Sequence, residues 1–142
     1  MEYRLIQDDV FNHKDCYYAH CISRDYALGA GIAVEFDKRY NMRNRLLKLA
    51  KEKPETLDEK CIEVENVFNL ITKEKYWQKP SYKSLEESLL EMKEKLSKNK
   101  NIKKLVMPKI GCGLDRLSWG KVEPMVQEIF KDLDIELVVC YL

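Results

Sequence analysis

The chain has 142 residues, of which 45% are hydrophobic, and it carries 25 Lys and Arg residues against 24 Asp and Glu residues. This length predicts one domain over residues 1–142 with a core of its own, and it is too short for two domains that each bury a sizeable core. The near balance of charge excludes an overall field that would draw the protein to nucleic acid or to a membrane surface.

Alternating strands and helices dominate the pattern along the chain. Runs rich in β-branched and aromatic residues predict strands at residues 3–6, 17–22, 61–64, 67–72, 105–107 and 135–141. Apolar spacings of three and four predict helices at residues 32–40, 43–53, 81–97 and 122–133, and in the last of these Pro124 fits only in the first turn. The alternation predicts a three-layer α/β/α sandwich around a mixed, mainly parallel sheet.

Two glycine loops, Gly29-Ala30-Gly31 and Gly111-Cys112-Gly113, are the main functional signal. Each lies between a strand-like and a helix-like run. Glycines at i and i+2 let bare backbone N–H groups approach a ligand, and a following helix adds its positive N-terminal end. The loops therefore predict an anion held from both sides, with a diphosphate as the natural candidate, while ordinary turns are the alternative.

Two side chains near these loops are candidates for catalysis. Lys73 ends an apolar strand, and a lysine that is partly buried or beside other cations can lose its proton near neutral pH and attack a sugar carbonyl or anomeric carbon. Asp115 follows the second loop, where a carboxylate can act as general base toward water or toward the lysine amine. The alternative for Lys73 is a surface lysine that closes a strand.

Two further candidates have weaker support. Asp9 follows the first strand and could accept a hydrogen bond from the exocyclic amine of a purine, although an acidic loop residue is usually just solvated. Cys112 could be a nucleophile, but it is interpreted as structural because the two histidines, His13 and His20, offer it no obvious partner.

Cysteine usage and the N-terminal residues indicate a cytoplasmic protein. The five cysteines include no C-x-x-C pair, which favours neither a disulfide framework nor a tetrahedral zinc site. The first nine residues carry charges where a signal peptide needs an apolar stretch, and no segment approaches a membrane span. We expect no metal, no cofactor and no membrane partner.

Six segments carry a family resemblance: QDDVF (7–11), AHCIS (19–23), LGAGIAV (28–34), LITK (70–73), KPSY (79–82) and MPKIGCGLDRLSW (107–119). In this order, and over nearly the whole chain, the sequence resembles a macrodomain of the terminal ADP-ribose protein glycohydrolase class. The resemblance implies ADP-ribose as the ligand and Lys73 with Asp115 as the catalytic pair. In this class the lysine attacks the anomeric carbon of a ribose joined to a glutamate or aspartate side chain, and the aspartate helps to form and resolve the covalent sugar–lysine intermediate.

The resemblance also implies which residues bind the substrate. An aspartate matching Asp9 contacts adenine, and the two glycine loops hold the distal ribose and the diphosphate. The implied binding residues are Asp9, Ser23, Gly29, Ala30, Gly31, Ile32, Ile110, Gly111, Cys112, Gly113 and Leu114. The chain departs from the family at its end, where Tyr141 is displaced by one residue.

Several alternatives remain open at this point. A sister class works without the lysine around an Asn-Ala-Ala-Asn motif, whereas residues 20–23 here read His-Cys-Ile-Ser. The ADP-ribose could be carried by a protein, by a small ester such as O-acetyl-ADP-ribose, or by a nucleic acid base. A reader that binds ADP-ribose without cleaving it is the alternative to an enzyme, but a reader has no need of Lys73.

Overall fold

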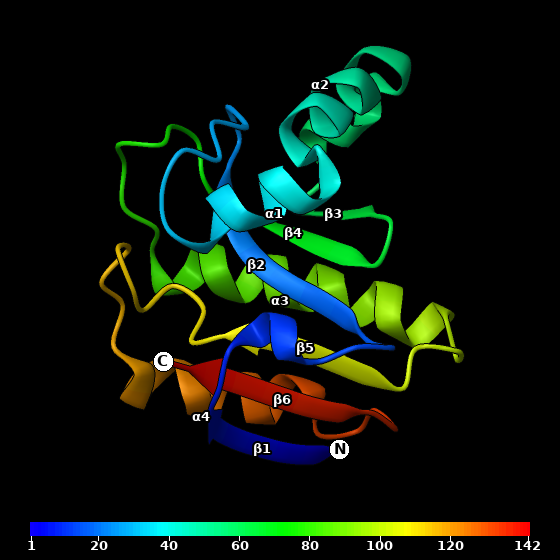
Figure 1. Ribbon diagram of the computed structural model, residues 1–142, viewed down its shortest axis with the longest axis vertical. Coiled ribbons are helices and arrows are strands. Elements are labelled where there is room, and N and C mark those ends of the chain that lie inside the picture. The colour runs from blue at the N-terminus through cyan, green and yellow to red at the C-terminus, as the bar shows by residue number, and fades with distance from the viewer.

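The computed structural model describes all 142 residues, and a six-stranded sheet runs through its middle (Figure 1). The strands are β1 (Glu2–Gln7), β2 (Tyr17–Ser23), β3 (Cys61–Val64), β4 (Val67–Lys73), β5 (Lys104–Pro108) and β6 (Glu136–Tyr141). The helices are α1 (Ile32–Tyr40), α2 (Met42–Glu52), α3 (Tyr82–Lys98) and α4 (Trp119–Phe130), with short 3-10 turns η1 (Val10–Asn12) and η2 (Pro54–Asp58). Every predicted strand and helix occurs, with bounds shifted by no more than three residues.

The strand order is β1-β6-β5-β2-β4-β3. All neighbouring strands are parallel except β3 and β4, which form an antiparallel hairpin. This arrangement confirms the mixed, mainly parallel sheet.

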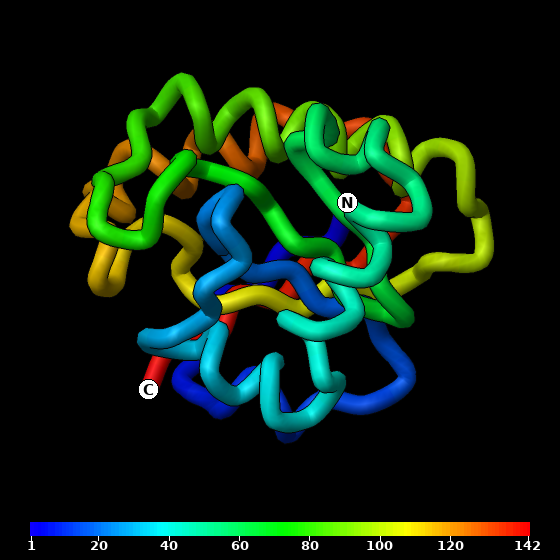
Figure 2. Tube along the Cα trace, turned by 90° about the horizontal axis from the view of Figure 1, so that it is seen from above, coloured from blue at the N-terminus to red at the C-terminus, as the bar shows by residue number.

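Helices cover both faces of the sheet, so the three-layer prediction is also confirmed. Helices α3 and α4 pack on one face and α1 and α2 on the other, and Figure 2 shows α1 opposite the α3 and α4 layer. Successive strand residues alternate between the two cores: in β5, Leu105 and Met107 belong to the α3 and α4 side, whereas Val106 belongs to the α1 side. No helix has the length and apolar character that a membrane span requires.

The placement of Pro124 corrects one prediction. Helix α4 begins at Trp119, so Pro124 is its sixth residue rather than part of the first turn. The helix starts early because the backbone N–H groups of Lys121 and Val122 both donate to the Ser118 carbonyl, at 3.0 Å. Proline leaves one helical bond unmade, and the buried apolar face of α4 compensates for it.

Parallel strands bring three carboxyl ends to the same edge of the sheet. Ser23 ends β2 and pairs in register with Lys73, which ends β4, and Pro108 ends β5 on the other side of β2. The loops that follow these strands therefore face each other.

Candidate active site

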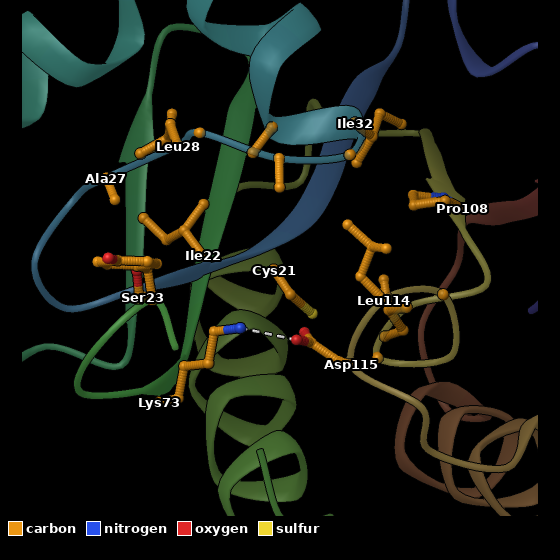
Figure 3. A pocket seen from close by; sticks show the side chains of 18 of the residues that line it. Cys21, Ile22, Ser23, Ala27, Leu28, Ile32, Lys73, Pro108, Leu114 and Asp115 are labelled. Carbon is orange, nitrogen blue, oxygen red and sulfur yellow. Dashed lines mark hydrogen bonds and ion pairs between the residues drawn. The ribbon is translucent and has the colours of Figure 1, made fainter. Parts of the chain in front are cut away.

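A cleft of about 740 Å³ opens at this edge of the sheet (Figure 3). Its walls come from the end of β2, the loop and first turn of α1, the end of β4 with the loop after it, and the loop after β5. The lining includes the predicted residues Ser23, Gly29, Ala30, Gly31, Ile32, Lys73, Ile110, Gly111, Gly113, Leu114 and Asp115. The sequence signals thus converge on one cavity.

Lys73 and Asp115 meet within this cleft. The Lys73 Nζ donates a hydrogen bond to Asp115 Oδ1 across 2.7 Å, and Figure 3 shows the two side chains extending toward each other. Their side chains are only 15% and 17% exposed. The pair is thus largely withdrawn from water and placed for direct proton transfer between nitrogen and oxygen.

The first glycine loop owes its conformation to Gly31. This residue has φ 61° and ψ −148°, a region that L side chains rarely adopt, and it is the N-cap of α1. No side chain caps the helix, so its first N–H groups have no side-chain acceptor. Because Gly31, Ile32 and Ala33 line the cleft, the positive end of α1 faces into it.

The loop before Gly31 is held in a strained form by burial. Tyr26 and Leu28 have φ values of 54° and 46°, yet they are only 2% and 6% exposed. The Asp25 carboxylate fixes the turn by accepting hydrogen bonds from Ser23 Oγ and from the Ala27 N–H. Apolar burial and these bonds offset the backbone strain, so the cleft wall is preformed.

The second glycine loop depends on Gly111 more than on Gly113. Gly111 has φ 72°, and a Cβ atom there would lie 3.0 Å from Leu117 Cδ1, whereas a Cβ at Gly113 would meet no atom within 4 Å. One expectation for this loop is wrong: α4 begins only at Trp119, and no residue of that helix lines the cleft. Helix α1 alone therefore supplies a helix N-terminus to the site.

The thiols near Lys73 and Asp115 are not activated. Cys21, which sequence analysis left out of the site, lines the cleft, and Figure 3 shows its sulfur beside Asp115. Burial, reinforced by the Asp115 charge, raises the pKa of Cys21 to about 12. Cys112 is not among the lining residues; its thiol donates to the Ile110 carbonyl at 3.3 Å, and burial raises its pKa as well. Both thiols therefore stay protonated at neutral pH, which argues against either as a nucleophile.

Asp9 lies outside the cleft. It is exposed just past the end of β1, and its carboxylate caps η1 by accepting the Phe11 N–H at 2.9 Å. Next to this edge, the Lys109 ammonium lies 4.5 Å from the centre of the Tyr141 ring. The role of Asp9 toward adenine stays a prediction.

Two lining residues from the loop after β4 are not among the residues predicted from the sequence. Tyr76 and Lys79 line the cleft, and the Lys79 Nζ donates to the Leu114 carbonyl at 3.0 Å, tying that loop to the second glycine loop. Lys79 lay within a matching segment, but nothing in the sequence marked Tyr76. No three His, Cys, Asp or Glu side chains gather in a way that could hold a metal ion.

Comparisons with known proteins place the chain in a family. The sequence is 43% identical over 121 residues to the ADP-ribose glycohydrolase OARD1 of Homo sapiens, covering 85% of this chain and 78% of that protein. It is 42% identical over 120 residues to the Bos taurus protein of the same name, covering 84% and 78%. The chain belongs to the macrodomain family, in the terminal ADP-ribose glycohydrolase class.

Solved structures agree at the level of the macrodomain fold. The macrodomain of Mycobacterium tuberculosis DarG superimposes with a TM-score of 0.85 at 20% identity, covering 97% of this chain and 96% of that one. The macrodomain of Thermus aquaticus DarG gives 0.84 at 17% identity, covering 99% and 98%. No protein-family model matches the sequence.

Proposed function

We propose that this macrodomain is an ADP-ribosyl glycohydrolase that releases ADP-ribose from glutamate and aspartate side chains through a covalent intermediate on Lys73. The observation that carries the proposal is the 2.7 Å hydrogen bond between Lys73 Nζ and Asp115 Oδ1 inside the cleft. The relatives named ADP-ribose glycohydrolase support the activity. A binding module needs the loops but has no use for a shielded lysine–carboxylate pair.

The geometry supports a two-step displacement. Asp115 takes a proton from the Lys73 ammonium, and the freed electron pair of Nζ forms a bond to the anomeric carbon while the bond to the carrier's carboxyl oxygen breaks. Asp115 then passes its proton to the departing carboxylate. In the second step Asp115 takes a proton from water as the water oxygen bonds to the anomeric carbon, and Nζ leaves and recovers that proton.

The diphosphate fits between the glycine loops. The uncapped N-terminus of α1 offers N–H groups and positive potential from one side, and the backbone around Gly113 offers open space on the other. Neither contribution needs a charged side chain. The ADP-ribose then lies with its terminal ribose toward Lys73.

The acid–base groups of the cleft favour an ester as the bond that breaks. A carboxylate is stable at neutral pH, since Glu has an ordinary pKa of about 4.3, and it leaves with little help from an acid. The Cys21 thiol also lines the cleft, but its pKa of about 12 makes it a poor proton donor. A small acyl ester at the anomeric oxygen, such as 1″-O-acetyl-ADP-ribose, meets the same requirement, whereas a nucleic acid base is a leaving group that needs more help from an acid.

Substitution of Lys73 tests this function. Lys73→Ala is expected to lose turnover of a glutamate-linked ADP-ribosyl peptide while keeping its affinity for free ADP-ribose, because the loops do the holding. Release of ADP-ribose and calorimetric titration measure the two properties. Full turnover by Lys73→Ala would exclude the covalent lysine, and a wild-type protein that binds ADP-ribose but cleaves no linkage is a reader.

A further inference from the structure

The loop between β4 and α3 displays two large aromatic side chains that the fold does not use. Tyr76 is 66% exposed and Trp77 is 67% exposed, and they are adjacent in sequence. Tyrosine and tryptophan are enriched at protein interfaces relative to the rest of the surface. Their position is three and four residues beyond Lys73.

This aromatic pair lies on a loop that is already fixed. The Tyr76 N–H donates to Asp25 Oδ2 at 2.9 Å, and the Lys75 N–H donates to Gln78 Oε1 at the same distance. The Gln78 N–H returns a bond to the Lys75 carbonyl at 3.0 Å. A partner that binds here would therefore order little of the loop, which favours affinity.

The loop is also continuous with the site of reaction. Tyr76 lines the cleft that holds Lys73, and Trp77 follows it in sequence as an exposed side chain outside the cleft lining. Whatever is joined to the anomeric carbon must leave the cleft near Lys73. Leu114, 63% exposed, adds an apolar side chain on the facing loop.

Cations outnumber carboxylates around the aromatic pair, where Glu74 is exposed on the same loop and Asp25 accepts the Tyr76 N–H. Lys75 and Lys79 flank the pair in sequence, and Arg116 is exposed on the facing loop. None of these three cations has a carboxylate within ion-pair distance, whereas the Asp115 charge is taken by Lys73. The surface therefore complements a negatively charged partner.

We propose that Tyr76 and Trp77, with Lys75, Lys79 and Arg116 around them, bind the polypeptide that carries the ADP-ribose, and that they select acidic segments around the modified glutamate. The proposal rests on the ester chemistry assigned to the site, because the leaving group is then part of a protein chain. Tyrosine and tryptophan supply rigid contact area at low entropic cost, and the cations meet neighbouring carboxylates.

The test compares a large and a small carrier. The substrates are a peptide with one ADP-ribosylated glutamate flanked by acidic residues, and 1″-O-acetyl-ADP-ribose, which has the same ester at the anomeric carbon but no polypeptide beyond it. Trp77→Ala is expected to raise KM for the peptide about tenfold with little change in kcat, and to leave the small ester unaffected. Leu90→Ala removes an exposed apolar side chain from α3, outside the cleft, and is expected to change KM for neither substrate.

Reversing the charge of Lys75 provides a second test. Lys75→Glu is expected to raise KM for the acidic peptide and to weaken its dependence on salt, while a peptide with neutral flanks is less affected. If the wild-type protein cleaves both substrates and Trp77→Ala changes KM equally for both, the proposed role of Tyr76 and Trp77 is wrong, whereas the lysine mechanism is unaffected. If Trp77→Ala impairs only release from an ADP-ribosylated single-stranded oligonucleotide, the carrier is nucleic acid and the peptide proposal is overturned.

Discussion

Gly31 and Leu114 lie opposite each other across the cleft, and a Cβ atom added to Gly31 would come within 3.4 Å of Leu114 Cδ1. The two glycine loops are therefore so close that a methyl group on Gly31 would contact the Leu114 side chain. A diphosphate that enters between them must share this space with Leu114, whose exposed side chain is free to turn outward.

Substitution at Gly31 is expected to cost stability as well as binding. Gly31→Ala places a side chain at φ 61° and ψ −148°, which costs about 1–3 kcal/mol of unfolding free energy. Gly29→Ala is the matched control, because its nearest neighbour is the Ala27 carbonyl at 3.9 Å and its φ is ordinary. Urea unfolding of both variants measures the difference, and equal loss in the two would contradict a backbone role for Gly31.

Gly113 offers the opposite experiment, since nothing in the fold requires a glycine there. Gly113→Glu is expected to unfold like wild type but to lose ADP-ribose affinity, because the new carboxylate occupies the open side of the cleft and repels the diphosphate. Calorimetric titration with ADP-ribose measures this, with Gly113→Gln separating charge from size. Wild-type affinity in Gly113→Glu would refute the diphosphate position.

Removal of Asp115 is expected to expose the intermediate. Asp115→Ala keeps Lys73 but lacks the base that activates water, so a slowly formed sugar–lysine adduct persists. Intact-mass spectrometry after incubation with the glutamate-linked substrate would detect protein heavier by one ADP-ribosyl group, and digestion would place the group on Lys73. Absence of the adduct with continued turnover would point to direct attack by water.

A buried histidine predicts how stability depends on pH. His20 is fully buried and stacks on Phe36 with ring centres 4.1 Å apart. Asn69 Nδ2 donates to the Ile62 carbonyl, so Asn69 Oδ1 accepts and His20 Nε2 carries the proton at 2.7 Å. The second proton would have to go to Nδ1, which has no partner, and burial accordingly lowers the pKa of His20 to about 4.

The direction of this effect follows from proton uptake. The unfolded chain, with a histidine pKa near 6.5, binds more protons than the folded one between pH 6.5 and pH 4, so stability falls as pH decreases through that window. At pH 4 this difference in proton binding lowers the free energy of unfolding by about 3 kcal/mol. His20→Gln keeps a donor for Asn69 without titrating. Urea unfolding at pH 7, 5.5 and 4.5 is therefore expected to give a shallower pH dependence for this variant, and identical slopes would count against His20.

The sequence predicts the fold well because hydrophobic period and strand composition act locally. The error at α4 has a different origin: Trp119 lies three residues before Val122 and continues the apolar stripe, but the expectation that Pro124 occupies the first turn starts the helix late at Val122. Lys73 and Asp115 were found because each stands just beyond a strand or a glycine loop. Tyr76 and Cys21 were not, since their place at the cleft depends on how distant strands pair.

The pairing of β1 with β6 joins the first strand of the chain to the last, from Glu2 with Glu136 to Gln7 with Tyr141. Strand β1 lies at the edge of the sheet and has no other neighbour, so its strand pairing can form only after β6 has been synthesised. During synthesis β1 therefore stays unpaired until β6 has been made. Deletion of residues 136–142 would remove the partner of β1 and leave β5 with an unpaired edge. Truncation within β6 is therefore expected to destabilise the fold.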